Sequence, residues 1–162
     1  MIQAVRENPF NAFLNVYDTR ISQRPAAAIR HLFKFINDLD GAVFYAYPSI
    51  ENYYDRYFKG AFLYSSPTVS ADVYLGKLDL IPAGYFKYEV YEVSWVGDEV
   101  ALTSATAPRT ETEVLPVRPE NGVVEGLVAI GKLYLAEKSG SEEVQYTEYE
   151  APSETNTIYY GQ

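Results

Sequence analysis

The sequence predicts an all-β protein, an antiparallel β-sandwich of immunoglobulin-like kind with a long loop and an extended C-terminal tail. Short segments in which apolar and polar residues alternate recur along the chain, separated by Gly, Pro, Asn, Asp or Ser residues. Hardly any stretch has the apolar spacing of an amphipathic helix. About eight short strands joined by such turns are typical of a sandwich, and a closed barrel is the alternative.

The length of the chain indicates a single domain. Its 162 residues can bury a substantial core, but they would be cramped as two full domains. We place the sandwich domain at residues 1–150, with the long loop at residues 97–122, and the tail at residues 151–162. Because no apolar run approaches the ~18 residues of a membrane span, we expect no membrane segment. The first residues also lack the pattern of a signal peptide, so we do not expect export by that route.

The first half of the chain contains four predicted strands. The first covers residues 10–16, which follow Asn8 and Pro9. Residues 18–29 form a polar connection with one helical turn at most, behind Pro25. A hairpin then has its strands at residues 31–36 and 42–47 and its turn at residues 37–41. Residues 49–56 are predicted to be a short helix or a wide loop, and residues 57–64 form the next strand.

The clearest signal in the sequence is residues 77–95, which we interpret as two strands joined by a tight turn at residues 82–84. The apolar side chains of the second strand lie on one face and are expected to be buried; they are Phe86, Tyr88 and Val90. The opposite face carries Lys87 and Glu89, which are expected to be exposed or at an interface.

After Val90 the apolar side chains change to the other face of the same strand. The new apolar set is Tyr91, Val93 and Trp95, and the polar residues opposite are Glu92 and Ser94. This change predicts a β-bulge near residues 90–91 or a strand that leaves one sheet for the other.

The second half continues with an irregular segment at residues 97–121, which is long for a loop in a compact domain. A strand follows at residues 123–135, with bends expected at Gly126 and Gly131. A turn at residues 138–141 leads into another strand at residues 144–149.

The net charge of −9 is unevenly distributed. Residues 1–81 carry equal numbers of acidic and basic side chains, so the whole excess of negative charge lies in residues 82–162. An acidic surface repels phosphate backbones, and we therefore expect no nucleic-acid partner. A solvated acidic surface is the favoured interpretation, and docking on a basic neighbour is the alternative.

No group of residues has the spacing of a catalytic, cofactor or metal site, so we expect no enzyme activity. Zero cysteines exclude thiolate ligands. The remaining candidates are Glu89 with Glu92, Asp38 with Asp40, the single histidine His31, and the glycines Gly122, Gly126 and Gly131. The two glutamates point to opposite faces of a strand, and the aspartates fit an ordinary hairpin turn. The histidine fits a core or edge strand, and the glycines have the wrong spacing for a phosphate loop.

Aromatic side chains offer one further candidate site. A sugar-stacking platform can be formed by Tyr53, Tyr54 and Tyr57 together with Trp95. Packing of these rings within the sheets is the favoured interpretation.

The order of motifs along the chain resembles that of small β-sandwich virion proteins of tailed bacteriophages. The motifs are Asn8-Pro9 and the segments at residues 31–38, 54–57, 84–92 and 128–135. The segment at residues 97–121 departs from the shortest versions of the pattern. The resemblance implies a structural component of the head, the head–tail connector or the tail, made in the host cytoplasm and located in the virion.

The same resemblance implies that the protein acts by binding neighbours: other virion proteins of the capsid, portal, connector or tail, and further copies of itself. Residues 97–122 and 151–162 are the predicted contact segments, because ordering a polar tail needs buried apolar side chains to offset its entropy cost. The expected contact residues are Pro108, Pro116, Pro119, Ile158, Tyr159 and Tyr160. The alternative function is a carbohydrate- or receptor-binding module at the base of a phage fibre.

Overall fold

The computed structural model describes residues 1–66, 68–97 and 100–138. Its strands are β1 (Ile2–Val5), β2 (Phe10–Leu14), β3 (Ile29–Asn37), β4 (Val43–Ala46), β5 (Ile50–Tyr53), β6 (Phe58–Tyr64), β7 (Lys77–Leu78), β8 (Gly84–Ser94) and β9 (Val123–Ala136). One turn of 3-10 helix, η1 (Ala26–Ala28), follows Pro25 as predicted. The predicted strand at residues 144–149 and the tail, with Ile158, Tyr159 and Tyr160, lie outside the described residues.

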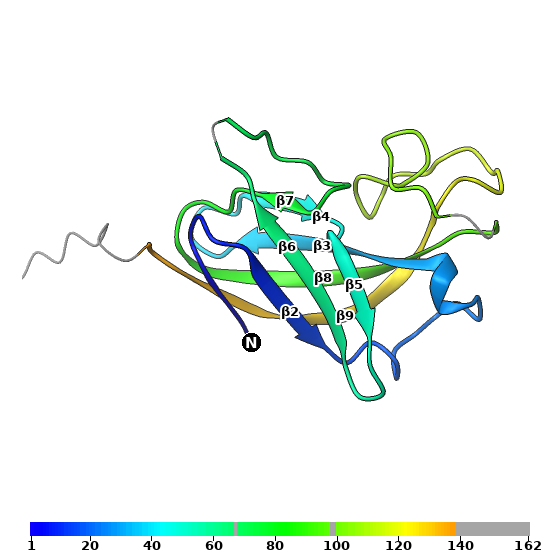
Figure 1. Cartoon of the computed structure of the whole chain (residues 1–162), viewed down its shortest axis with the longest axis horizontal. Coiled ribbons are helices and arrows are strands. Elements are labelled where there is room, and N and C mark those ends of the chain that lie inside the picture. The colour runs from blue at the N-terminus through cyan, green and yellow to red at the C-terminus, as the bar shows by residue number, and fades with distance from the viewer. Residues whose placement is uncertain (67, 98–99, 139–162) are drawn as a thin grey trace, which may run out of the picture.

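The strands form two sheets that pack face to face (Figure 1). The five-stranded sheet has the order β1-β9-β8-β3-β4, and the second sheet has the order β2-β6-β5, with β7 paired to β6. All pairs are antiparallel except β1 with β9 and β6 with β7. The prediction of an all-β sandwich is confirmed, while its immunoglobulin-like subtype stays a prediction.

Aromatic and aliphatic side chains fill the space between the sheets. Phe33 and Phe35 of β3 meet Phe58 and Phe62 of β6 there, with ring centroids 5.0 Å apart for Phe33 and Phe62. All four side chains are buried because alternate residues of each strand face the opposite sheet.

The predicted burial of the central strand is largely confirmed. Phe86, Tyr88 and Val90 of β8 all lie in the core, and Val90 is 0% exposed. On the other face, the Lys87 side chain is 42% exposed but that of Glu89 is only 12% exposed. Glu89 is therefore not exposed, because neighbouring side chains on the outer face of the sheet cover it. The alternative, a position at an interface with another chain, stays a prediction.

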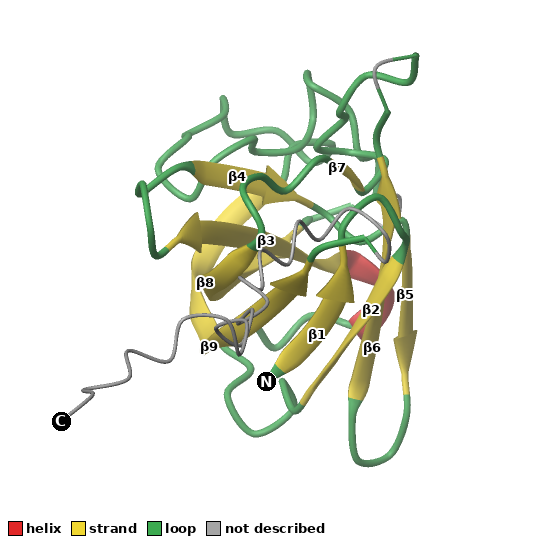
Figure 2. Cartoon of the chain, turned by 90° about the vertical axis from the view of Figure 1, so that its left-hand side faces the viewer, coloured by secondary structure: helices red, strands yellow, loops and turns green. Residues whose placement is uncertain are grey.

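Residues 77–95 do not form the predicted hairpin. Leu63 and Tyr64 of β6 are the strand partners of β7, and the connection at residues 82–84 carries the chain from one sheet to the other (Figure 2). The turn residues at 82–84 did not predict that β7 pairs with β6. Leu78 and Leu80 are buried in the core between the sheets and hold the segment around β7 there.

The N-terminal segment and residues 49–56 also differ from the prediction. Strand β1 precedes the first predicted strand, since Ile2 and Ala4 face the core while β1 pairs in parallel with β9. Residues 49–56 were predicted to be a helix or loop, but β5 pairs with β6 there. The amide of Tyr54 donates to the carbonyl of Tyr57 at 3.0 Å in the turn between these strands.

A second core lies on the outer face of the five-stranded sheet, under the long loop. Leu32 and Tyr47 from the sheet region pack there with Val93, Trp95 and Ala107. Because the loop buries this face, the outer side of β8 carries apolar residues after Val90. The side chains of β8 still alternate between its two faces along the whole strand. Gly122 lies against the Trp95 ring, where a Cβ would approach Cζ2 to 2.6 Å.

The register between β8 and β9 shifts at two places, Val90/Tyr91 and Glu92/Val93, which confirms an irregularity at the predicted position. The extra residues belong to β9, where Gly126 has a φ of 154°. Gly131, in contrast, keeps regular pairing with Tyr88 and is not a break in the strand.

Replacement of Val90 by aspartate is expected to prevent folding. The side chain is completely buried in the core, and an unpaired carboxylate there costs about 3–5 kcal/mol, a large part of a domain's stability. Circular dichroism and a thermal melt measure the effect. The control is Ile130→Asp on the exposed outer face of β9; a V90D melting curve equal to that of the control contradicts the assignment.

Candidate functional site

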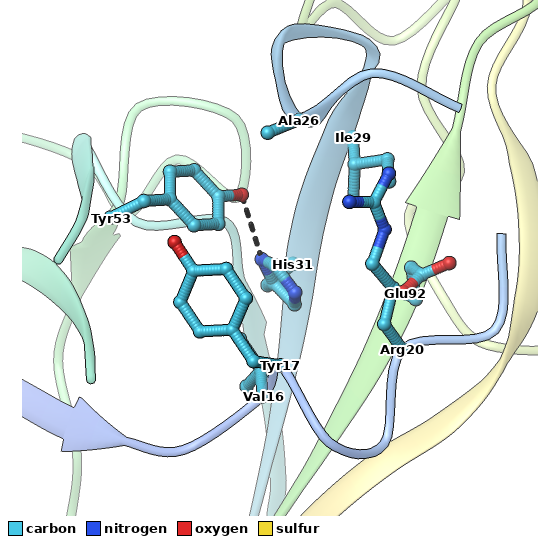
Figure 3. Close-up of a pocket in the computed structure, with 8 residues that line it drawn as sticks. All are labelled: Val16, Tyr17, Arg20, Ala26, Ile29, His31, Tyr53 and Glu92. Atoms are coloured by element: carbon cyan, nitrogen blue, oxygen red, sulfur yellow. Dashed lines mark hydrogen bonds between the residues drawn. The ribbon is translucent and has the colours of Figure 1, made fainter. Parts of the chain in front are cut away.

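At one end of the interior, polar side chains take the place of apolar ones. His31 of β3 and Glu92 of β8 are register partners and face the second sheet, where Tyr53 of β5 lies opposite (Figure 3). Glu51, also of β5, lies beside His31. The His31 and Glu51 side chains are 3% and 4% exposed. Such deeply buried polar groups need hydrogen bonds to be tolerated.

Glu51 connects the two sheets. Its Oε1 accepts the backbone N–H of His31 at 2.9 Å, and its Oε2 lies 3.3 Å from His31 Nδ1. Pairing of β3 with β4 ends at Phe33 and Ala46, after which the chain crosses to the other sheet through Pro48. The N–H of His31 is left without a partner strand, and the carboxylate of Glu51 takes that place.

The Tyr53 hydroxyl completes this network. It donates to Glu51 Oε2 at 3.0 Å and lies 3.4 Å from His31 Nδ1, the contact drawn in Figure 3. Burial, reinforced by the Glu51 carboxylate, raises the pKa of Tyr53 well above its ordinary value of 10.0. The hydroxyl therefore stays protonated and acts as a donor.

Glu92 holds the connection between β2 and η1. Its side-chain oxygens accept the backbone N–H groups of Ile21 at 3.2 Å and Ser22 at 2.6 Å. Arg20 reinforces the same turn, since its Nε donates to the carbonyl of Ser22 at 2.9 Å. A carboxylate that binds two backbone amides is a strong, charge-assisted acceptor.

A small cavity lies among these side chains. It is lined by Val16, Tyr17, Arg20, Ala26, Ile29, His31, Tyr53 and Glu92 (Figure 3). Its volume of ≈ 20 Å³ is enough for one or two water molecules but not for a sugar ring. In the part of the chain that the structure describes, no serine or threonine hydroxyl is hydrogen-bonded to His31. We conclude that the network joins the two sheets, as expected for a core histidine.

A second polar cluster fastens the long loop to the outer face of the five-stranded sheet. Lys34 Nζ lies 2.5 Å from Glu111 Oε1 and 3.6 Å from Glu89 Oε2. The Tyr45 hydroxyl donates to Glu111 Oε2 at 2.6 Å, and the Tyr91 hydroxyl donates to Glu89 Oε2 at 2.8 Å. The loop is therefore fixed by the Lys34–Glu111 ion pair as well as by the second core.

These contacts shift the pKa values of the carboxyl groups. Burial opposes ionisation of Glu111, but hydrogen bonds from Lys34 and Tyr45 outweigh it and hold its pKa below 4.5. The pKa of Glu89 is also lowered, mainly by the hydrogen bond from Lys87. Burial raises the pKa of Tyr91 to about 12.

The three prolines that were predicted to contact other chains differ in their exposure. Pro108 is buried, and its carbonyl accepts the Tyr47 hydroxyl at 2.7 Å, so this residue contacts its own domain. Pro116 is exposed beside Val114 and Val117, and Pro119 is also exposed, but the carbonyl of Pro119 accepts the amide of Gly97 at 3.1 Å, where the loop begins. Their role in assembly stays a prediction.

The four rings considered as a sugar-stacking platform, the alternative to packing within the sheets, do not come together. Trp95 is completely buried in the second core, away from the tyrosines of the β5–β6 hairpin. Tyr54 and Tyr57 do stack at that turn with centroids 4.6 Å apart, and Phe13 of β2 lies 5.9 Å from Tyr57. Sequence reasoning missed Phe13 because only the pairing of β2 with β6 brings it to this turn.

The other sequence candidates have structural roles. Glu89 and Glu92 lie on opposite faces of β8, as predicted. Asp40 Oδ1 accepts the amide of Ala42 at 2.9 Å within the β3–β4 hairpin turn, and Asp38 Oδ2 lies 2.5 Å from Lys132 Nζ. The three glycines belong to β9 or the residue just before it.

No protein-family model, curated protein or solved structure matches this chain. Residues 1–66, 68–97 and 100–138 contain no group of three or more His, Cys, Asp or Glu side chains placed to hold a metal ion. Over the same residues, no helix has the length and apolar character needed to cross a membrane.

Replacing Glu92 with glutamine is expected to destabilise the fold. The amide has one acceptor oxygen, so one of the part-buried hydrogen bonds from the N–H groups of Ile21 and Ser22 is lost, which costs about 1–3 kcal/mol. Urea denaturation measures the free energy of unfolding. The control is Glu120→Gln at an exposed site, where the change is expected to stay within about 0.5 kcal/mol; equal stabilities of the two variants contradict the role of Glu92.

The contact of Glu111 that fastens the loop and the contacts of Glu89 within the sheet are expected to make stability fall in acid. Both groups have lowered pKa values in the folded protein, so their contribution is complete above pH 4.5 and is lost as the pH falls below it. Urea midpoints between about pH 7 and pH 3 measure this loss. Glu111→Gln is expected to flatten the profile below pH 4.5 and Glu120→Gln to leave it unchanged; an E111Q profile identical to wild type refutes the prediction.

Proposed function

We propose that this chain is a structural subunit of a tailed-bacteriophage virion, a capsid-associated or head–tail connector or tail protein that works through contacts between subunits. The virion assignment rests on the resemblance in the order of sequence motifs. The binding role rests on one structural observation, the exposed apolar tip of the long loop. Val114 is 91% exposed and Val117 is 98% exposed.

The base of this loop is held against the sheet while its tip stays exposed. Tyr47 binds the carbonyl of Pro108, and Lys34 pairs with Glu111 on the chain leading to the tip. On the returning chain, Asn121 Nδ2 donates to the carbonyl of Pro116 at 2.7 Å. A surface that is ordered before binding loses less conformational entropy in a complex. Full burial of each exposed valine contributes roughly 1.5–3 kcal/mol.

The expected partners are further copies of this chain and other virion proteins of the capsid, portal, connector or tail. The protein then resides in the virion after synthesis in the host cytoplasm. The net charge of −9 supports protein contacts rather than binding to nucleic acid.

A carbohydrate- or receptor-binding module is the second candidate, favoured by the rings of Phe13, Tyr54 and Tyr57. These three side chains are at least 40% exposed and lie in contact at one turn. Exposed aromatic rings offer flat apolar faces to a ligand. The virion role is preferred because it accounts for the loop tip as well.

The double variant Val114→Asp/Val117→Asp is expected to fold normally and to lose assembly. The two side chains are almost fully exposed, so charges there leave the melting temperature unchanged but oppose burial in an interface. Sedimentation velocity of the purified chain measures self-association. Mass spectrometry of purified particles measures incorporation and copy number.

The matched control is Leu39→Asp, which changes an exposed leucine in the β3–β4 turn. It is expected to assemble like wild type. A wild-type chain that stays monomeric and is absent from particles contradicts the proposal. Glycan binding that is lost in Tyr57→Ala, in a chain that does not assemble, favours the second candidate instead.

A further inference from the structure

Strands β1 and β2, each the free edge of its sheet, lie side by side (Figure 2). An open groove lies between them. Its volume is ≈ 660 Å³, and residues from both strands line it together with Tyr134 and Ala136 of β9. Free strand edges are places where a further extended segment of polypeptide can bind.

The backbone of β1 has unpaired groups that face this groove. The N–H of Arg6 donates to the carbonyl of Ala136 at 2.8 Å, so Arg6 and, two residues earlier, Ala4 direct their backbone groups toward β9. The N–H groups of Gln3 and Val5 therefore point away from β9. Neither has a hydrogen-bond partner among the described residues.

Apolar side chains line the same groove without being covered. Phe13 is 59% exposed, and Val5 and Tyr134 are each 39% exposed. A strand laid along β1 would pair with the free amides and cover these side chains with its own alternate residues. The groove thus has both the backbone and the side-chain features of a strand-binding site.

We infer that residues 144–149 of this same chain bind the groove as an added strand beside β1. The described chain ends at the rim of the groove, where Lys138 Nζ lies 2.7 Å from Glu7 Oε2. The first four residues of this segment alternate, with Val144 and Tyr146 on one side and Gln145 and Thr147 on the other, and Glu148 and Tyr149 then reverse the pattern. These features are those expected of a half-buried strand.

The connecting length fits this arrangement. The edge beyond β1 lies two strand spacings from β9, about 10 Å. Residues 139–143 span up to about 16 Å when extended. Since β1 runs parallel to β9, a chain that reverses after β9 meets β1 in the antiparallel direction. So short a link gives the segment a local concentration on the order of millimolar, which favours its own groove over that of another molecule.

Amide hydrogen exchange of the full-length protein tests this inference. The amide of Val5 is expected to exchange at least about tenfold more slowly than a free amide. The amide of Ala4, which points to β9, is the internal reference for protection. Exchange of Val5 at the rate of an unprotected amide overturns the proposal.

Proline variants and protein concentration identify the occupant. Gln145→Pro and Tyr146→Pro are expected to remove the protection of Val5 but not of Ala4, because proline has no N–H and breaks a strand. The control Asn156→Pro, further along the tail, is expected to leave both unchanged. Protection that persists in both proline variants, or that appears only at high protein concentration, shows a different occupant and overturns the assignment.

Discussion

The structure depends on burial of β8 from both sides. On one face its side chains pack against the second sheet, and on the other the long loop covers Tyr91, Val93 and Trp95. A strand covered on both faces cannot have one polar side throughout, and its polar residues must be hydrogen-bonded. Glu92 and Ser94 meet this condition through the amides of the β2–η1 connection and through Glu125.

The same constraint accounts for the polar end of the interior. Where the chain crosses from one sheet to the other, a strand has no neighbour on one side. A backbone N–H group is then left without a strand to bind. Glu51 satisfies the amide of His31, while Glu92 satisfies two amides of a connection that has no strand beside it. Each carboxylate thus accepts the N–H groups that the carbonyls of a neighbouring strand would otherwise accept. Burial of these carboxylates is tolerated because each of their oxygens accepts a hydrogen bond.

The exposed tip of the long loop and the free edge of β1 lie far apart. The tip of the long loop is at one end of the molecule, and β9 runs from there to the opposite end, where the described chain ends beside β1 (Figure 1). In the inferred arrangement the free edge of β1 is occupied by the protein's own chain, so the loop tip is the surface that remains for neighbouring subunits.

The sequence by itself determined the all-β class, the positions of β2, β3, β4, β6, β8 and β9, and the burial of Val90. It did so because alternation and turn residues are local signals with a period of two. Only the tertiary structure decided that β7 joins β6, that β1 joins β9, and that the long loop covers the sheet. Those outcomes depend on contacts between residues far apart in the chain, such as Lys34 with Glu111 and His31 with Glu51. Local patterns carry no information about which distant partner will satisfy a buried charge or an unpaired amide.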